Sequence, residues 1–336
     1  MNKLADLITQ KGYALADGAI GTNLFAKGLM TGDAPELWNF DEVDKITELH
    51  QEFVDAGSDV ILTNSFGGTT YRMKLHQAED KVEEINIAAA QIARAVADKA
   101  ERAVIVAGSM GPTGELFVPL GALDEAGAIA AFTEQANALA KGGVDVLWVE
   151  TMSSVEEMQA AVTAAKSTGL PVYGTMTFDT AGRSMMGILP GDFARQAHEL
   201  GLDGFGANCG IGPSELLDSV FGFVESHQGE ASVIAKGNCG IPAYVEGKIH
   251  YHGTPELMAD YALVAYRAGA QIIGGCCGTT AGHIKAMHDA LATKAETTPI
   301  NRSEAAEILG KPWADLPQAP EGGGERKRRR RRDKSE

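Results

Sequence analysis

The sequence contains no apolar run close to the roughly 20 residues that a membrane-spanning helix needs. Its first residues, 1–6, are polar and resemble neither the basic nor the apolar region of a secretory signal. Cysteine is also scarce, with four residues in 336. These features predict a cytoplasmic protein, in which cysteines stay reduced and more often bind metals or react than form disulfides.

Positive charge is scarce outside the C-terminus. The chain has 29 Lys and Arg against 45 Asp and Glu, and eight of the basic residues fall between positions 326 and 334. The acidic body argues against nucleic-acid binding by the folded domain. A basic tail could instead anchor the protein on RNA or a membrane surface, but it lacks the interleaved aromatic residues typical of sequence-specific RNA binding.

Eight short apolar segments alternate with helical patterns along most of the chain. The expected strands are residues 13–17, 59–63, 103–107, 144–149, 172–177, 204–208, 232–236 and 270–275. Between them, apolar residues recur every three or four positions, as in helices packed on a sheet. Several of these helices are expected to end at a glycine, namely Gly57, Gly143, Gly169, Gly201 and Gly269. The pattern predicts an α/β fold, a (β/α)8 TIM barrel, with a doubly wound open sheet as the alternative.

The pattern also divides the chain. We expect a single barrel domain over residues 1–295, a C-terminal extension over 296–320 and a disordered, Arg-rich tail over 321–336, where like charges repel. A short helix is expected from Asn301 to Ile308, before Gly310. Because the active site of such a barrel lies at the carboxyl ends of its strands, one rim should carry Asp17, Asn64, Ser109, Glu150, Phe178, Cys209, Asn238 and Cys276.

Three cysteines stand where two expected strands end. Cys209 follows the segment 204–208, while Cys276 and Cys277 lie in the sequence GGCCG at 274–278. If these strand ends are close in space, the three sulfurs can converge on one point. Three thiolates with an open fourth position are the ligands that a catalytic zinc ion needs.

Other interpretations of these cysteines remain open. They could be small buried apolar residues, or Gly274 and Gly275 could form the phosphate-binding loop common in this fold. A phosphate loop would not explain two adjacent cysteines. The fourth cysteine, Cys239, could complete a closed four-ligand site, which would make the protein a non-catalytic zinc-binding module.

The motifs together resemble those of the homocysteine S-methyltransferase family, in order, over about residues 10–293. The segments that carry the resemblance are DGAIGT at 17–22, TNSF at 63–66, GSMGP at 108–112, VET at 149–151, ANCG at 207–210 and GGCCG at 274–278. The resemblance implies that Cys209, Cys276 and Cys277 bind Zn²⁺ and that the substrate thiol takes the fourth position. The implied reaction is methyl transfer to L-homocysteine, giving methionine.

The resemblance also implies how the amino acid is bound. Asp17 and Glu150 would hold the homocysteine ammonium, and Ser109, with the two residues after it, could offer backbone N–H groups to the carboxylate. Asp17 could instead stabilise a turn, as Asp often does before Gly. A carboxylate such as that of Glu150 at the end of an apolar strand is costly unless it is paired, which favours a binding role.

The methyl donor is less constrained by the sequence. Onium donors are usually held against aromatic rings, and the candidates near the rim are Trp38, Phe66, Tyr71 and Phe178, with Tyr244 more remote. Overall the chain resembles short, Arg-tailed bacterial betaine–homocysteine methyltransferases, which favours glycine betaine or a similar onium compound. However, Gly67 and Thr151 stand where the animal betaine enzymes carry tyrosines. A methyl-corrinoid protein and S-methylmethionine are therefore the alternative donors, although the chain shows no cobalamin- or folate-binding domain.

Overall fold

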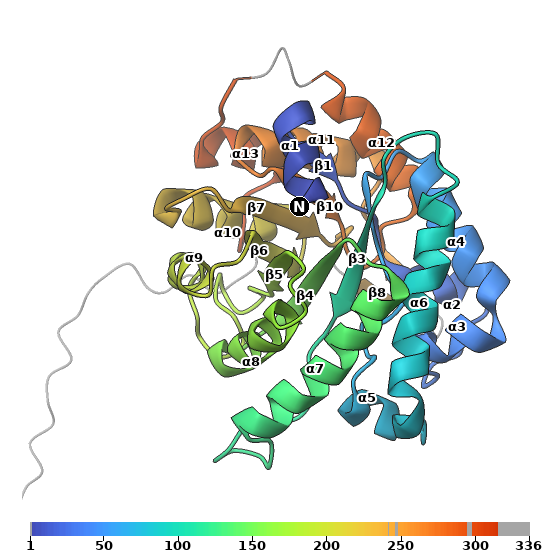
Figure 1. Cartoon of the computed structure of the whole chain (residues 1–336). Coiled ribbons are helices and arrows are strands. Elements are labelled where there is room, and N and C mark those ends of the chain that lie inside the picture. The colour runs from blue at the N-terminus through green and yellow to red at the C-terminus, as the bar shows by residue number, and fades with distance from the viewer. Residues whose placement is uncertain (1, 241, 246–247, 294–297, 315–336) are drawn as a thin grey trace, which may run out of the picture.

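The computed structural model describes residues 2–240, 242–245, 248–293 and 298–314. Within them, eight parallel strands form a barrel that is surrounded by helices (Figure 1). The Arg-rich tail expected at 321–336, and the last residues of the expected C-terminal extension, lie outside the described residues. The division into a barrel, an extension and a tail therefore stays a prediction.

The strands lie close to where the apolar segments predict them. They are β1 (Ala14–Leu15), β2 (Val60–Leu62), β3 (Ile105–Met110), β4 (Val146–Met152), β5 (Val172–Met176), β6 (Gly204–Cys209), β7 (Ser232–Gly237) and β10 (Ile272–Gly275). The sheet order β1-β10-β7-β6-β5-β4-β3-β2 follows the chain around the barrel. A parallel bridge between Ala16 and Val60 joins the two ends of this sheet. The TIM barrel prediction is confirmed, and the open sheet is excluded.

The helices surround the sheet (Figure 1). They are α1 (Lys3–Lys11), α2 (Ile20–Ala26), α3 (Trp38–Asp41), α4 (Val43–Asp55), α5 (Thr70–Lys74), α6 (Val82–Ala97), α7 (Glu125–Gly142), α8 (Val155–Lys166), α9 (Pro190–Glu199), α10 (Pro213–Ser226), α11 (Pro255–Arg267), α12 (Ala281–Leu291) and α13 (Arg302–Leu309), with 3₁₀ turns at Pro35–Leu37 and Glu79–Lys81. Of these helices, α4 and α6 to α12 pack directly on the outer face of the sheet. The expected glycines at helix ends, Gly57, Gly143, Gly169, Gly201 and Gly269, all have positive φ. No helix among the described residues is long and apolar enough to cross a membrane.

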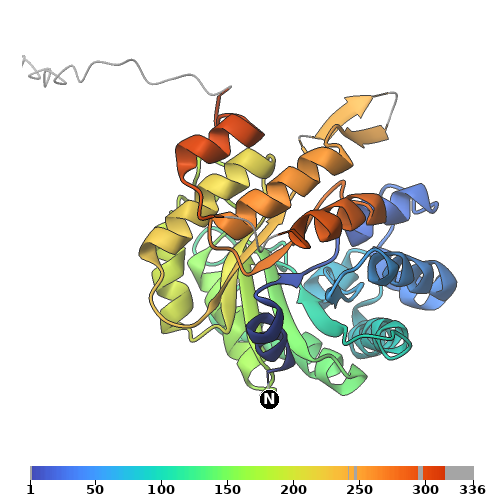
Figure 2. The same cartoon turned by 90° about the horizontal axis from the view of Figure 1, so that it is seen from above.

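The interior of the barrel is plugged from its amino end. Leu4 and Ile8 of α1 are buried in the same cluster as the inward-facing side chains of the strands, where Trp148 stacks on Tyr173 with ring centroids 5.6 Å apart. Figure 2 shows α1 lying against this end of the barrel. Because the amino end is filled, a cavity can form only toward the carboxyl ends of the strands.

Two features lie outside the repeating units. A hairpin of β8 (Pro242–Val245) and β9 (Lys248–Tyr251), which is not among the elements expected from the sequence, projects from the barrel between β7 and α11 (Figure 2). The short C-terminal helix was predicted: Asn301 caps α13, and Gly310 follows it. Arg302 of α13 pairs with Asp218 and Glu225, which fastens this helix to α10.

Candidate metal and substrate site

The three cysteines converge at the carboxyl ends of β6 and β10. The Sγ of Cys209 lies 3.4 Å from that of Cys276 and 3.7 Å from that of Cys277, and all three sulfurs fall within 4.8 Å of one another. The two strands are not neighbours, because β7 runs between them, and both pair with its residue Gly237. The expected clustering of the three thiols is therefore present.

The spacing of the sulfurs fits a tetrahedral ion. Sulfurs bound to one Zn²⁺ at about 2.3 Å lie about 3.8 Å apart, close to the separations of 3.4 and 3.7 Å. Thiolates also suit Zn²⁺ as soft ligands. Because Cys209, Cys276 and Cys277 all line one cavity, a ligand within that cavity can supply a fourth donor atom.

A buried asparagine holds the loop that carries Cys209. Asn208 accepts from the N–H of Thr151 at 2.9 Å, donates to the Thr151 hydroxyl at 2.7 Å and lies 3.7 Å from the Cys276 sulfur. Both Thr151 and Cys209 adopt left-handed backbone conformations, with φ of 64° and 62°. Such a backbone conformation costs a non-glycine residue about 1–3 kcal/mol. The hydrogen bonds of Asn208 therefore stabilise a strained turn that directs the Cys209 sulfur toward those of Cys276 and Cys277.

A second asparagine joins the two cysteine loops. The side chain of Asn238, just after β7, donates to the carbonyl of Gly210 at 2.6 Å and accepts from the N–H of Cys277 at 3.0 Å. One amide therefore fixes the loop after Cys209 relative to the loop that carries Cys277. Such supporting contacts keep metal ligands in place before a metal binds.

The fourth cysteine does not join the cluster. Cys239 is buried, and its thiol lies 3.1 Å from the carbonyl oxygen of Gly253 and 3.2 Å from Nε2 of His283. Its N–H donates to the carbonyl of Cys277 at 2.9 Å, so it supports the loop through the backbone. Among the described residues the sulfur cluster contains three cysteines, and it is not the closed four-cysteine site considered as an alternative.

The cysteines form one wall of a cavity of about 350 Å³ at the carboxyl end of the barrel. Of the residues expected on the rim, those that line it are Asn64, Ser109, Glu150, Cys209 and Cys276. Asp17, Phe178 and Asn238 do not. Phe178 instead packs in an aromatic cluster with Phe193 and Phe223.

Glu150 and Ser109 meet on the cavity wall. The Ser109 hydroxyl donates to Oε1 of Glu150, which is 8% exposed. Burial raises the pKa of Glu150 to about 7, although the nearby ammonium of Lys236 opposes this shift. A cationic ligand group would therefore stabilise the ionised carboxylate.

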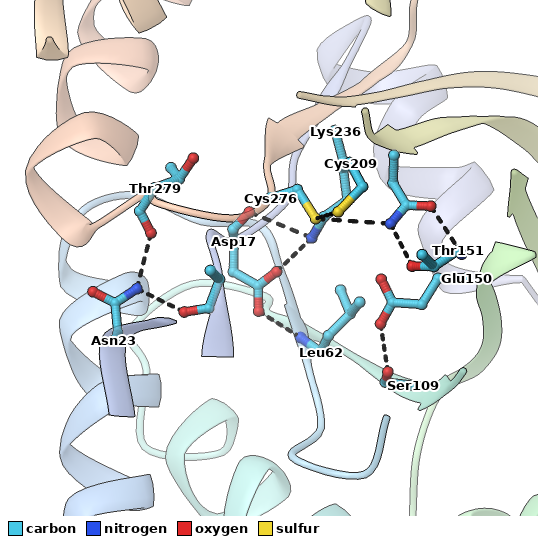
Figure 3. Close-up of polar contacts among 12 residues, drawn as sticks. Asp17, Asn23, Leu62, Ser109, Glu150, Thr151, Cys209, Lys236, Cys276 and Thr279 are labelled. Atoms are coloured by element: carbon cyan, nitrogen blue, oxygen red, sulfur yellow. Dashed lines mark hydrogen bonds and ion pairs between the residues drawn. The ribbon is translucent and has the colours of Figure 1, made fainter. Parts of the chain in front are cut away.

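Asp17 lies beneath the cavity surface. Its Oδ1 accepts from the ammonium of Lys236 at 2.7 Å, and its Oδ2 accepts from the N–H of Leu62 at 2.7 Å (Figure 3). Burial disfavours the charged form of Lys236, but Asp17 and Glu150 outweigh that effect and raise the pKa of Lys236. Both oxygens of Asp17 are thus engaged within the protein.

Lys236 lines the cavity itself and was not among the residues selected from the sequence. A signal was present, since this lysine follows the apolar run 233–235 within an expected strand. A charge in that position is almost never buried without a partner. The partner, Asp17, is 219 positions away, so the sequence pattern alone did not connect the two.

The aromatic residues expected to hold a donor are not brought together. Phe66 lines the cavity, whereas Trp38 and Tyr71 do not. Trp38 is buried in the core with the Lys45 ammonium 4.5 Å from its ring centroid, and Tyr71 packs against the same core. The second aromatic ring in the cavity wall belongs to Phe25, which was not predicted.

The sequence of the barrel itself matches a known family. A model described as homocysteine S-methyltransferase matches residues 14–291, which is most of the chain. The chain belongs to the homocysteine S-methyltransferase family. The matched range includes every strand of the barrel and all three clustered cysteines.

Two similar proteins are much longer than this chain. The methionine synthase of Mycobacterium tuberculosis is 30% identical over 306 residues, which cover 86% of this chain and 25% of that protein. The methionine synthase of Mycobacterium leprae is 30% identical over 295 residues, covering 83% of this chain and 24% of that protein. The chain thus spans about a quarter of the length of these two relatives.

Solved structures share the fold. The homocysteine methyltransferase MmuM from Escherichia coli, in its metallated form, has a TM-score of 0.72 at 22% identity, with 86% of this chain and 99% of that chain covered. Its apo form gives a TM-score of 0.65 at 19% identity, with 84% and 98% covered. At these identities the likeness shows the shared barrel.

The cysteine cluster makes a direct prediction about metal content. Replacing Cys209, Cys276 or Cys277 by Ala should each abolish tight Zn²⁺ binding, because two thiolates leave the site incomplete. The matched control is Cys239→Ala, which should retain the metal since its sulfur is turned toward Gly253. Metal analysis of the purified, reduced proteins checks this. Full metal content in Cys276→Ala would contradict the assignment.

The contacts of Asn208 make a second prediction. Asn208→Ala should weaken Zn²⁺ binding by about 10- to 100-fold, the usual effect of removing a group that orients a ligand. The control is Thr175→Val, which removes the hydroxyl that donates to Oδ1 of Asn208 at 2.8 Å and leaves the contacts to Thr151 and Cys276 in place. Competition with a chromophoric chelator measures both affinities. Unchanged affinity in Asn208→Ala would show that the turn holds without its amide.

Proposed function

We propose that this protein transfers a methyl group to the thiol of L-homocysteine, giving methionine, with Zn²⁺ held by Cys209, Cys276 and Cys277. The observation that carries this proposal is the convergence of three sulfurs, within 4.8 Å of one another, on the wall of a cavity that also contains the Glu150 carboxylate. Family membership over residues 14–291 supports the choice of a thiol as the methyl acceptor.

The chain's own residues would bind and orient the acceptor. Glu150 has one oxygen bonded to Ser109, and the other is proposed to accept from the substrate ammonium. Bound Zn²⁺ would supply deprotonation of a thiol whose ordinary pKa is near 8.5. The remaining requirement is alignment of the sulfur with the methyl group, so the rigid strand ends contribute mainly by positioning.

For the donor, we propose glycine betaine or a similar onium compound. Away from the strand ends, the cavity lining includes two carboxylates, Asp33 and Glu36, and two aromatic rings, Phe25 and Phe66, together with the basic side chains of Arg72 and His76. Carboxylates and aromatic faces both attract a cationic methyl donor. Glu36 is 4% exposed, and its Oε1 accepts from the N–H of Gly67 at 2.6 Å, so its position is fixed. Of the aromatic residues expected from the sequence, this arrangement includes Phe66 but neither Trp38 nor Tyr71.

A second candidate donor is a methyl-corrinoid protein. Two relatives are methionine synthases of which this chain spans about a quarter, which leaves room for a donor carried by another domain or protein. Large apolar side chains also stand exposed on the loops after β3 and β5, including Leu116 at 60%, Leu120 at 73% and Met185 at 73%. Exposed apolar side chains on loops at the carboxyl end of the barrel suit contact with a protein partner.

A donor panel tests the proposed reaction. Zinc-loaded, reduced protein with L-homocysteine should form methionine fastest with glycine betaine or another onium donor, tested beside dimethylsulfoniopropionate, S-methylmethionine and a methyl-corrinoid protein. Methionine is quantified by mass spectrometry, with Cys276→Ala as the inactive control. Product formation with the corrinoid protein alone would select the second candidate, and no product with any donor would refute the proposed function.

Glu150 makes a prediction about the acceptor. Glu150→Gln should weaken homocysteine binding by roughly 1.5–3 kcal/mol, the value of a hydrogen bond to a charged group, while zinc content stays unchanged. A thiol that lacks the amino group should be insensitive to the change. The control is Glu134→Gln, an exposed carboxylate that also accepts from a hydroxyl, that of Thr70. Equal losses for both thiols in calorimetric titrations would remove Glu150 from ammonium binding.

A further inference from the structure

Lys236 is a buried cation on the wall of the cavity. Its side chain is 2% exposed, it lies at the end of β7, and it shares the cavity with Glu150 and the three clustered cysteines. We infer that Lys236 binds the α-carboxylate of the amino-acid acceptor and so restricts the acceptor to zwitterionic thiols. This inference rests on the proposed function, because it concerns how the same substrate is recognised.

The first argument is the way in which Lys236 is held. Its ammonium donates to Oδ1 of Asp17 at 2.7 Å and lies 3.4 Å from the carbonyl oxygen of Asp17. An ammonium has three N–H donors, so these two contacts leave one. Asp17 is fully buried and does not line the cavity, so its contacts orient Lys236. Lys236, which does line the cavity, is then the residue that can contact the substrate.

The second argument is that two of the backbone donors expected to meet the carboxylate are already engaged. The N–H of Ser109 donates to the hydroxyl of Thr63 at 3.0 Å, and the N–H of Gly111 donates to the carbonyl of Phe66 at 2.9 Å. Both N–H groups were expected from the sequence to meet the substrate carboxylate. A carboxylate placed against these two groups would find no free N–H, and burying it unpaired would be costly.

The third argument is charge complementarity. An α-amino acid carries an ammonium and a carboxylate on one carbon, so its site needs an anion and a cation close together. Glu150 and Lys236 meet this requirement, and each is close enough to affect the pKa of the other. Figure 3 shows the Lys236 ammonium directed into the space between Asp17 and Glu150, on the side of the cysteine sulfurs.

A different role for Lys236 would give a different experimental result. If the lysine only neutralises Asp17, its loss should weaken all thiol ligands alike, and loss of both charges in Asp17→Asn/Lys236→Met should restore binding. If it binds the carboxylate, its loss should affect only ligands that carry one. The double variant also avoids leaving a buried, unpaired Asp17, so it keeps the test valid if Lys236→Met alone does not fold.

The test compares two thiols in calorimetric titrations of the zinc-loaded protein. L-Homocysteine carries both charged groups, and 3-aminopropane-1-thiol is the same molecule without the carboxylate. Wild type should bind homocysteine about 10- to 100-fold more tightly, the range for a charged hydrogen bond. In Lys236→Met and in Asp17→Asn/Lys236→Met, this preference should fall to near unity. The matched control is Lys141→Met, an exposed lysine paired with Glu83, which should keep the preference.

Three results would overturn the inference. One is a preference for homocysteine that persists in both variants, which would assign the carboxylate to backbone N–H groups. Another is equal loss for both thiols, and the third is recovery of wild-type affinities in the double variant. Because binding is measured without a methyl donor, failure of this inference is distinct from failure of the proposed function, which is judged by methionine formation in the wild type.

Discussion

Barrel closure depends on Asp17, because the strand before it is only two residues long. Its N–H donates to the carbonyl of Val60 at 3.0 Å, and its carbonyl accepts from the N–H of Gly275 at 3.1 Å. Its carboxylate accepts hydrogen bonds from the N–H of Leu62 and from the ammonium of Lys236. One residue thereby connects β1 to β2, β10 and β7. Removing one partner of a buried ion pair typically costs about 3–5 kcal/mol, so the same contact that completes the barrel also fixes the cation in its cavity.

The proposed metal ligands depend on this closure, since they project from strand ends whose order it sets. Cys209 and Cys276 come from strands separated by β7, and the sulfurs meet because both strands pair with Gly237 at the same level. The last step is local: a left-handed turn at Cys209, with φ of 62°, held by the Asn208 amide. The barrel thus brings the two cysteine loops close together, and short hydrogen bonds then orient the sulfurs.

Much of this could be predicted from the sequence, and the omissions have physical reasons. Strands and helix ends follow from local apolar patterns and glycines, and the cysteine cluster follows from where two strands end. The partner of Asp17 could not be found in this way, because Lys236 approaches it from a distant strand. The sequence pattern also could not predict the direction of individual side chains. Trp38 faces the core beneath Lys45, while Phe25, which belongs to none of the recognised motifs, lines the cavity.

The residues proposed to bind the methyl acceptor and those proposed to bind the methyl donor lie on different parts of the fold. The groups proposed for the acceptor, including Glu150, Lys236 and Cys209, stand at or next to strand ends, and Lys236 is paired with β6 on one side and β10 on the other. The groups proposed for the donor, including Glu36 and Phe66, lie on the connections that follow β1 and β2. Loops accept substitutions and insertions more readily than strands do. A barrel of this kind can therefore keep one acceptor while its donor changes, which explains why the sequence defines the thiol side of the reaction more sharply than the methyl side.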